Sequence, residues 1–185
     1  MKKITFSLTL AAVITGGFLG ANYINNQQAS ADNVVVREAH ANFIDDFSDK
    51  RKLVGATDNV FVGKVIEQAG TKSLDGGPET QFTVEVISTV KGKLSGEVLV
   101  NQQGGYLENE EGETELLLIE DDQLLVPGET YLFATRYLES ENWHTVVPAY
   151  GDLKIDSEAK KSEIMKAFKE AYKNQVIPED LKDKK

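Results

Sequence analysis

Residues 81–90 read QFTVEVISTV, and this stretch decides the fold class. Apolar side chains occupy every second position in its first half, which is the period of a β-strand rather than of a helix. Such alternation is typical of a strand with one face on a core and the other toward solvent. We therefore expect Val84 and Val86 to be buried and Thr83 and Glu85 to lie on the opposite face.

Further strand patterns lie on both sides of this stretch. They cover residues 59–68, 97–102, 130–138 and 143–147. Gly63 interrupts the first of them and is a candidate bulge, and Pro127-Gly128 has the composition of a type II turn. Because strand follows strand without an intervening helix, the pattern predicts an antiparallel barrel or sandwich.

Two stretches between the strands are expected to be loops because of their glycine content. Residues 70–78 contain three glycines and a proline, which predicts a long loop. Gly104-Gly105 begins a second loop, which is strongly acidic.

Two helices are expected to flank the strands. The shorter covers residues 48–57, where the Ser48 hydroxyl can cap the first turn and Leu53, Val54 and Ala56 face the core. The longer covers residues 157–174 and has apolar residues at helical spacing, with Asp156 or Ser157 as its cap.

The segments outside these elements are less regular. Val34-Val35-Val36 can form a short strand, and the apolar residues of 38–47 instead favour a helical turn or two, so both interpretations stay open. The charged residues 178–185 are expected to fray.

Residues 1–31 have the features of a secretory signal peptide. Lys2 and Lys3 precede an uncharged, mostly apolar stretch at 4–21, and Ala29-Ser30-Ala31 supplies the small residues that a signal peptidase accepts. Cleavage before Asp32 would give a secreted, extracellular protein without stable membrane insertion. The alternative is an uncleaved anchor helix, for which 4–21 is close to the lower length limit.

Composition excludes several classes of protein. The 185 residues contain no cysteine, which removes disulfide scaffolds, cysteine nucleophiles and zinc fingers. Lys and Arg number 20 against 30 Asp and Glu, and a formal charge of −10 argues against binding nucleic acid. Lack of cysteine in an exported chain is common in Gram-positive bacteria, which we take as the expected source.

Five stretches of strand and turn residues occur in a characteristic order, namely 58–65 (DNVFVGKV), 82–86 (FTVEV), 90–92 (VKG), 104–105 (GG) and 127–133 (PGETYLF). Together they resemble OB-fold domains related to the tissue inhibitors of metalloproteinases, in particular their exported bacterial relatives. The resemblance implies a mainly β fold, namely a five-stranded Greek-key barrel with a short N-terminal helix and a C-terminal amphipathic helix.

This resemblance and the patterns above give the expected organisation of the chain. It comprises a signal peptide (1–31), an N-terminal extension (32–47), an OB-fold-like barrel (48–155), a helix (156–177) and a charged tail (178–185). In the family, an N-terminal cysteine chelates the protease zinc and disulfides hold its segment on the barrel. This chain has no cysteine, so we expect its N-terminal extension to lack a covalent tether and the protein not to inhibit in that manner.

The acidic loop is the most unusual part of the sequence. Residues 108–122 hold eight acids and neither Lys nor Arg. Closely spaced carboxylates can bind Ca²⁺, which takes six to eight oxygen ligands. The candidate metal ligands are Glu108, Glu110, Glu111 and Glu113. The alternative is a solvated surface loop, which is the usual fate of a charge run.

No set of residues has the spacing of a catalytic centre. His40 and His144 are the only histidines, and neither H-E-x-x-H nor G-x-S-x-G occurs. We interpret His144 as a polar residue on the outer face of the barrel. The sequence therefore predicts no catalytic residue and no cofactor.

Aromatic side chains offer the remaining candidates for a binding site, because OB-fold barrels bind oligosaccharides and oligonucleotides on one face. Most of the aromatics are expected in the core. The ligand-binding candidates lie at strand ends or loops and are Tyr106, Tyr137, Trp143 and Tyr150.

These observations predict a secreted, non-enzymatic binding module whose partner is a protein or a cell-envelope ligand. One alternative is protease inhibition by a route that needs no cysteine. Another is a secreted hydrolase with paired carboxylates, one of which has a raised pKa. A deep cleft with convergent acids favours the hydrolase, and a shallow concave face favours binding.

Overall fold

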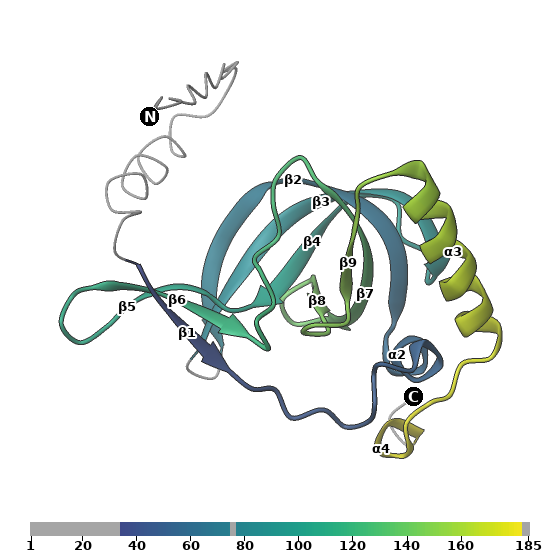
Figure 1. Ribbon diagram of the computed structural model, residues 1–185, viewed down its shortest axis with the longest axis horizontal. Helices are drawn as coiled ribbons and strands as arrows, with labels where there is room; N and C mark the ends of the chain where they lie inside the picture. The colour runs from purple at the N-terminus through teal and green to yellow at the C-terminus, as the bar shows by residue number, and fades with distance from the viewer. Residues whose placement is uncertain (1–33, 75–76, 183–185) are drawn as a thin grey trace, which may run out of the picture. The chain divides into compact units, whose positions relative to one another are not determined.

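The strands that follow residue 58 form a sheet that closes on itself (Figure 1). The computed structural model describes residues 34–74 and 77–182. The ring consists, in spatial order, of β2 (Asn59–Leu74), β3 (Gly77–Lys91), β4 (Gly96–Gln103), β8 (Trp143–Val146) and β7 (Thr130–Leu138). Antiparallel pairing of β7 with β2 closes the ring. The prediction of a mainly β fold is confirmed.

One strand pair in this ring is parallel. β4 and β8 pair through Val100 with His144 and Asn101 with Thr145, whereas the other neighbours are antiparallel. β9 (Asp152–Ile155), which the sequence patterns missed, pairs with the first half of β7. We call the closed ring of β2, β3, β4, β8 and β7 the barrel.

Gly63 allows β2 to bend into the barrel. The register of β2 against β3 shifts between Val62 and Gly63, so the predicted bulge is confirmed. A Cβ atom at Gly63 would lie 2.5 Å from Cγ1 of Val84, closer than two carbon atoms can approach without a shift. Glycine is therefore required here by the close approach of β3.

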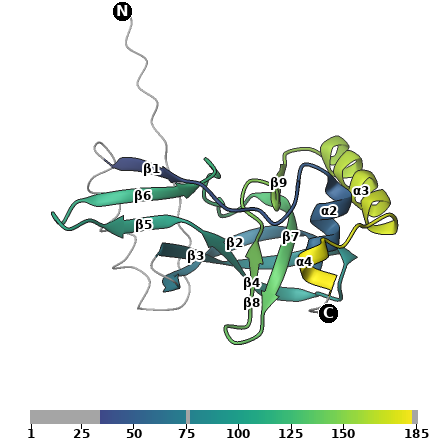
Figure 2. The same ribbon diagram turned by 90° about the horizontal axis from the view of Figure 1, so that it is seen from below.

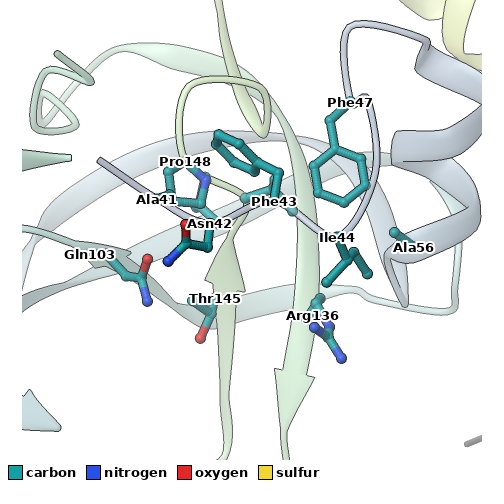
Figure 3. Close-up of a pocket in the computed structure, with 12 residues that line it drawn as sticks. Ala41, Asn42, Phe43, Ile44, Phe47, Ala56, Gln103, Arg136, Thr145 and Pro148 are labelled. Carbon is teal, nitrogen blue, oxygen red and sulfur yellow. The ribbon is translucent and has the colours of Figure 1, made fainter. Parts of the chain in front are cut away.

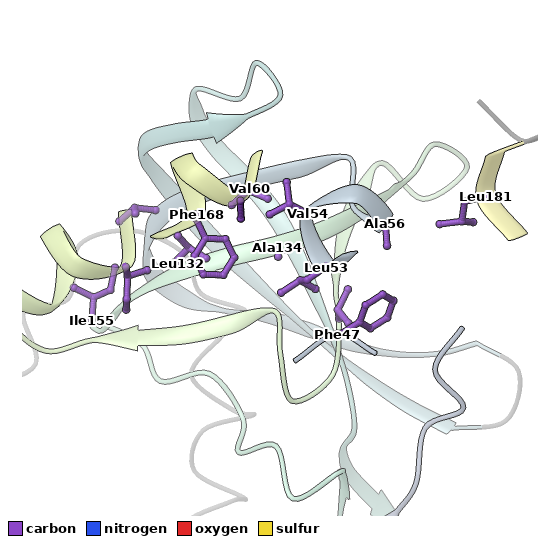
Figure 4. Packing of buried hydrophobic residues seen from close by; sticks show 14 residues of the cluster. Phe47, Leu53, Val54, Ala56, Val60, Leu132, Ala134, Ile155, Phe168 and Leu181 are labelled. Atoms are coloured by element: carbon purple, nitrogen blue, oxygen red, sulfur yellow. The ribbon is translucent and has the colours of Figure 1, made fainter. Parts of the chain in front are cut away.

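The alternation within β7 divides the apolar residues into two clusters. Tyr131 and Phe133 point inward, where they meet residues from every other strand of the barrel. Leu132 and Ala134 point outward and belong to a second cluster with the helices (Figure 4). Val84 is fully buried in the inner cluster and Val86 packs against it, while Glu85 is exposed, as the alternation predicts.

Two helices cover the outer cluster. In both views α3 (Glu158–Lys173) lies on the side of the barrel away from the sheet of β1 (Val35–Ala39), β5 (Gly105–Glu108) and β6 (Thr114–Ile119) (Figures 1 and 2). Ser157 caps α3 by accepting a hydrogen bond from the backbone N–H of Lys160, as predicted. The short helix is α2 (Lys50–Ala56), and its cap is Asp49 rather than the predicted Ser48.

The charged tail is partly ordered, contrary to the expectation of fraying. It contains α4 (Glu179–Lys182), whose Leu181 is buried in the outer cluster. Burial of the Leu181 side chain in the outer cluster is enough to order this turn, although the neighbouring residues are charged.

The predicted long loop at 70–78 is wrong. The pairing of β2 with β3 continues from Gly70 opposite Gln81 to Leu74 opposite Gly77, so the strands form one long hairpin. Residues 71–73 are exposed, so this arm shows no apolar alternation in the sequence.

The segment that was predicted to be an acidic loop is instead a β-hairpin. β5 (Gly105–Glu108) pairs with β6 (Thr114–Ile119), and β1 (Val35–Ala39) adds to β6 in parallel. The N-terminal segment therefore contains a strand, at 35–39 where 34–36 was predicted, and the predicted helical turn within 38–47 is wrong.

The predicted signal peptide and its cleavage site lie outside the described residues. Within the described part of the chain, no helix has the length and apolarity needed to cross a membrane.

Candidate functional site

Residues 40–49 link β1 to α2 and run across the outer face of β7 and β8 (Figures 1 and 3). We call these residues the strap. Aromatic contacts fix its middle, because the rings of Phe43 and Phe47 meet edge to face with centroids 5.8 Å apart. Tyr150 packs against both, at 5.4 Å from Phe43 and 6.4 Å from Phe47. The strap is therefore held on the barrel by packing rather than by a covalent bond.

Carboxylates of the acidic run fix the upstream end of the strap. Glu115 is buried and lies 2.7 Å from Nε of Arg37 on β1. Glu120 accepts a hydrogen bond of 2.8 Å from the backbone N–H of Ala41, and Nδ1 of His40 lies 3.4 Å from the same carboxylate. These two acids hold the N-terminal extension by non-covalent contacts, in the absence of the covalent tether that cysteines would provide.

A groove lies between the strap and the barrel (Figure 3). Its volume is about 350 Å³. Most of the lining is apolar and comes from the strap, the end of α2 and the segment 146–148. Its apolar residues are Ala41, Phe43, Ile44, Phe47, Ala56, Val146, Val147 and Pro148, and its polar residues are Asn42, Gln103, Arg136 and Thr145.

Arg136 is the only charged residue among those that line the groove. It lies on β7 directly opposite Thr145 of β8 and is exposed. In Figure 3 the polar ends of Gln103, Thr145 and Arg136 lie along one border of the groove, with Phe43 and Phe47 on the other side. The site thus offers an apolar surface with a polar border on one side.

The structure does not bring the four aromatic candidates together. Tyr150 supports the strap beside the groove, while Tyr106 is exposed on β5, opposite Leu116 of β6. Trp143 is buried, with the Lys72 ammonium 5.3 Å from its ring centroid. Tyr137 is exposed and its hydroxyl lies 2.8 Å from Oδ1 of Asn142. Sequence reasoning identified none of the residues that line the groove, because no local pattern relates the strap to β7 and β8.

His144 lies inside the barrel, not on its outer face as predicted. It is buried, its ring contacts Phe61 of the inner cluster, and Nδ1 lies 3.3 Å from Nδ2 of Asn59. Burial lowers the pKa of His144, against the smaller opposing effect of Asp58. The ring is therefore best described as a neutral structural histidine.

The four candidate calcium ligands remain at the surface. Glu108, Glu110, Glu111 and Glu113 are all exposed. The Asn109 side chain accepts hydrogen bonds from the backbone N–H groups of Glu111 and Glu113, which shapes the turn between β5 and β6. Over residues 34–74 and 77–182, no three His, Asp or Glu side chains gather as a metal ion would require.

A pair of carboxyl groups that the sequence did not reveal lies at the start of β9, beside the last residues of β4. Asp122 and Asp152 hydrogen-bond to each other, and Nε2 of Gln102 lies 3.2 Å from Oδ2 of Asp152. Burial, followed by the charge of Asp122, raises the pKa of Asp152 well above its ordinary range, and burial also raises the pKa of Asp122.

This carboxyl pair holds a loop rather than bordering the groove. Asp122 accepts a hydrogen bond of 3.0 Å from the backbone N–H of Ala149, and Gln102 bonds to the backbone of Gln123 and Leu125. Neither aspartate lines the groove. Asp152 is isolated in the sequence, so no spacing rule could have predicted its partner.

Comparisons with known proteins add no assignment. No protein-family model matches the sequence, and no curated protein matches it. The features of the site that bear on function are therefore the groove, its apolar lining and its single arginine.

Proposed function

We propose that the chain is a secreted, non-enzymatic binding module built on an OB-fold barrel. The strand order supports the fold. β8, the last strand of the barrel along the chain, lies between β4 and β7, so the connections follow a Greek-key path through five strands. The long β2–β3 hairpin and the added strands β1, β5, β6 and β9 are elaborations of that barrel.

The groove under the strap is the observation that carries the binding function. Small-ligand sites are concave, mostly apolar, and have volumes of about 300–1,000 Å³ with a few polar groups that orient the ligand. The groove has a volume of about 350 Å³ and meets this description. Contacts hold the strap at both its upstream end and its middle, so the site exists before a ligand arrives.

The lining of the groove favours binding over hydrolysis. General acid–base chemistry needs a titratable group within hydrogen-bond reach of the reacting atoms. Arg136 is the one ionisable group in the lining, and a guanidinium group has no acceptor atom with which to serve as a general base. The carboxyl pair of Asp122 and Asp152 does not contribute to the groove.

Export of the protein is part of the proposal and rests on residues 1–31. The ligand would then be a molecule of the cell envelope or of the surrounding medium. N-terminal sequencing of protein recovered from culture medium should begin at Asp32. Recovery of the intact N-terminus in the membrane fraction would contradict secretion but not binding.

The binding function is tested with a neutral apolar probe. We expect N-phenyl-1-naphthylamine to bind the purified chain and to fluoresce in the groove. Thr145→Phe should abolish this binding, because the larger side chain fills the border of the groove from the outer face of β8.

The matched control is Thr83→Phe, a half-buried position on β3 outside the groove. This variant should bind the probe as the wild type does. If a folded Thr145→Phe variant and the wild type bind the probe equally, the groove is not the binding site.

A further inference from the structure

We propose that the groove takes a small molecule with an apolar body and one carboxylate, and that Arg136 binds the carboxylate. This inference rests on the proposed function. It adds the chemical class of the ligand and the residue that selects it.

The charge of the groove is opposite to that of the chain. The sequence has 30 acids against 20 basic residues, yet the lining contains an arginine and no acid. A single cation beside apolar surface attracts an anion and repels a cation. An apolar ligand with a positive charge is therefore disfavoured.

Arg136 differs from the other two arginines of the sequence. Arg37 lies 2.7 Å from Glu115, and Arg51 lies 2.6 Å from Asp49. Among the residues that the structure describes, Arg136 has no carboxylate within ion-pair distance. Its planar guanidinium group can donate two parallel hydrogen bonds to a carboxylate, which a lysine cannot do.

The arrangement of the lining orients such a ligand. Figure 3 places Arg136 on the same border as Thr145 and below Ile44, with the rings of Phe43 and Phe47 on the far side. An apolar chain lies against the rings, and its carboxylate reaches the exposed border at Arg136. The Thr145 hydroxyl can donate a further hydrogen bond to the same carboxylate.

The size of the groove favours a small molecule over a peptide. A volume of about 350 Å³ is near the lower end of the range for ligand sites, about 300–1,000 Å³. The ligand that fits this volume is a free carboxylic acid with a single apolar chain. The C-terminal carboxylate of an apolar peptide offers the same chemistry and is an outcome of the test.

The test compares decanoate with decanol as competitors for bound N-phenyl-1-naphthylamine. The two ligands share their chain and differ in charge. Decanoate should bind the wild-type chain about tenfold more tightly, as expected for one charge-assisted hydrogen-bond pair. Added salt should reduce this preference, because Arg136 is exposed.

Arg136→Gln should remove the preference for decanoate over decanol, a ratio that is measured within the variant and does not depend on its affinity for the neutral probe. Arg136→Lys should keep part of the preference, since lysine retains the positive charge but cannot donate two parallel hydrogen bonds. Lys64→Gln is the matched control, because it removes an exposed positive charge on β2 outside the groove. It should behave as the wild type does.

The possible failures are distinguishable. If Arg136→Gln binds the neutral probe normally and still prefers decanoate, the assignment of Arg136 is wrong and the proposed function stands. If the wild type does not bind the neutral probe, the proposed function itself fails. If trileucine with a free C-terminus competes better than decanoate, and its amide does not, the ligand is a peptide and the small-molecule assignment is overturned.

Discussion

Asp122 and Asp152 share a hydrogen bond, and Asp122 fastens the loop at 120–126 to the segment before β9 by accepting a hydrogen bond from the backbone N–H of Ala149. Gln102 joins them through a 3.2 Å contact to Asp152 and through the backbone of the same loop. Two ionised carboxylates in hydrogen-bond contact repel each other in a partly buried site. A proton shared between Asp122 and Asp152 removes this repulsion, and ionisation of both groups should reduce the stability of the fold.

Stability should fall as the pH rises through the pKa of this pair. The pKa of Asp152 is raised in the folded state above its ordinary value of 3.8, so its contribution is complete below pH 3.8. Above that pH the unfolded chain releases the proton first, and the folded state is progressively disfavoured until Asp152 ionises as well. The Asp152→Asn variant has no ionisable group at this position, so it should be more stable than the wild type at pH 8.

The measurement is the free energy of unfolding in urea at pH 4, 6 and 8. The advantage of Asp152→Asn should shrink toward pH 4. Asp156→Asn, an exposed position next to β9, should show no such trend. An Asp152→Asn variant that is less stable than the wild type at every pH would show that the pair is not a repulsive one.

The tether of β1 should depend on Glu115. Glu115→Gln keeps the shape of the side chain and loses its charge opposite Arg37, which should cost about 1–2 kcal/mol, a range reduced because Arg37 is mostly exposed. Hydrogen exchange should speed up at the backbone amides of β1. Glu110→Gln at the exposed tip of the hairpin serves as the control and should change neither quantity.

The register of β3 is tested by two neighbouring substitutions. Val84→Asp puts a charge into the fully buried interior and should cost several kcal/mol, about 3 or more. Thr83→Asp, on the outer face, should cost about 1 kcal/mol or less. Fluorescence of Trp143, the single tryptophan, reports the unfolding because its side chain is buried. Equal losses in the two variants would contradict the register.

Calcium should not stabilise the protein specifically. Glu108, Glu110, Glu111 and Glu113 are exposed and point to no common centre among the described residues, so calcium and magnesium should shift the melting temperature equally. Thermal melts in either salt provide the measurement. A shift that calcium alone produces, and that Glu111→Gln removes, would establish a site in the β5–β6 hairpin.

The sequence predicts the barrel better than the groove, and the reason is physical. Residues 81–90 and 130–138 alternate because each strand faces two environments, so their local pattern is enough. The arm of the β2–β3 hairpin and the β5–β6 hairpin have solvent on much of their surface, which erases the alternation. Contacts such as Phe43 with Tyr150 join distant segments, and no local signal can reveal them.

The parallel pairing of β1 with β6 also has a consequence for the order of folding. Arg37 and Glu115 are 78 positions apart, so their contact closes a large loop and gains nothing until the barrel between them exists. We therefore expect the strap to dock last during folding and to open locally while the barrel stays folded. Affinity for a ligand is reduced by the fraction of molecules in which the strap is undocked. A ligand in the groove raises the docked fraction, so occupancy and protection of the β1 amides from exchange should increase together.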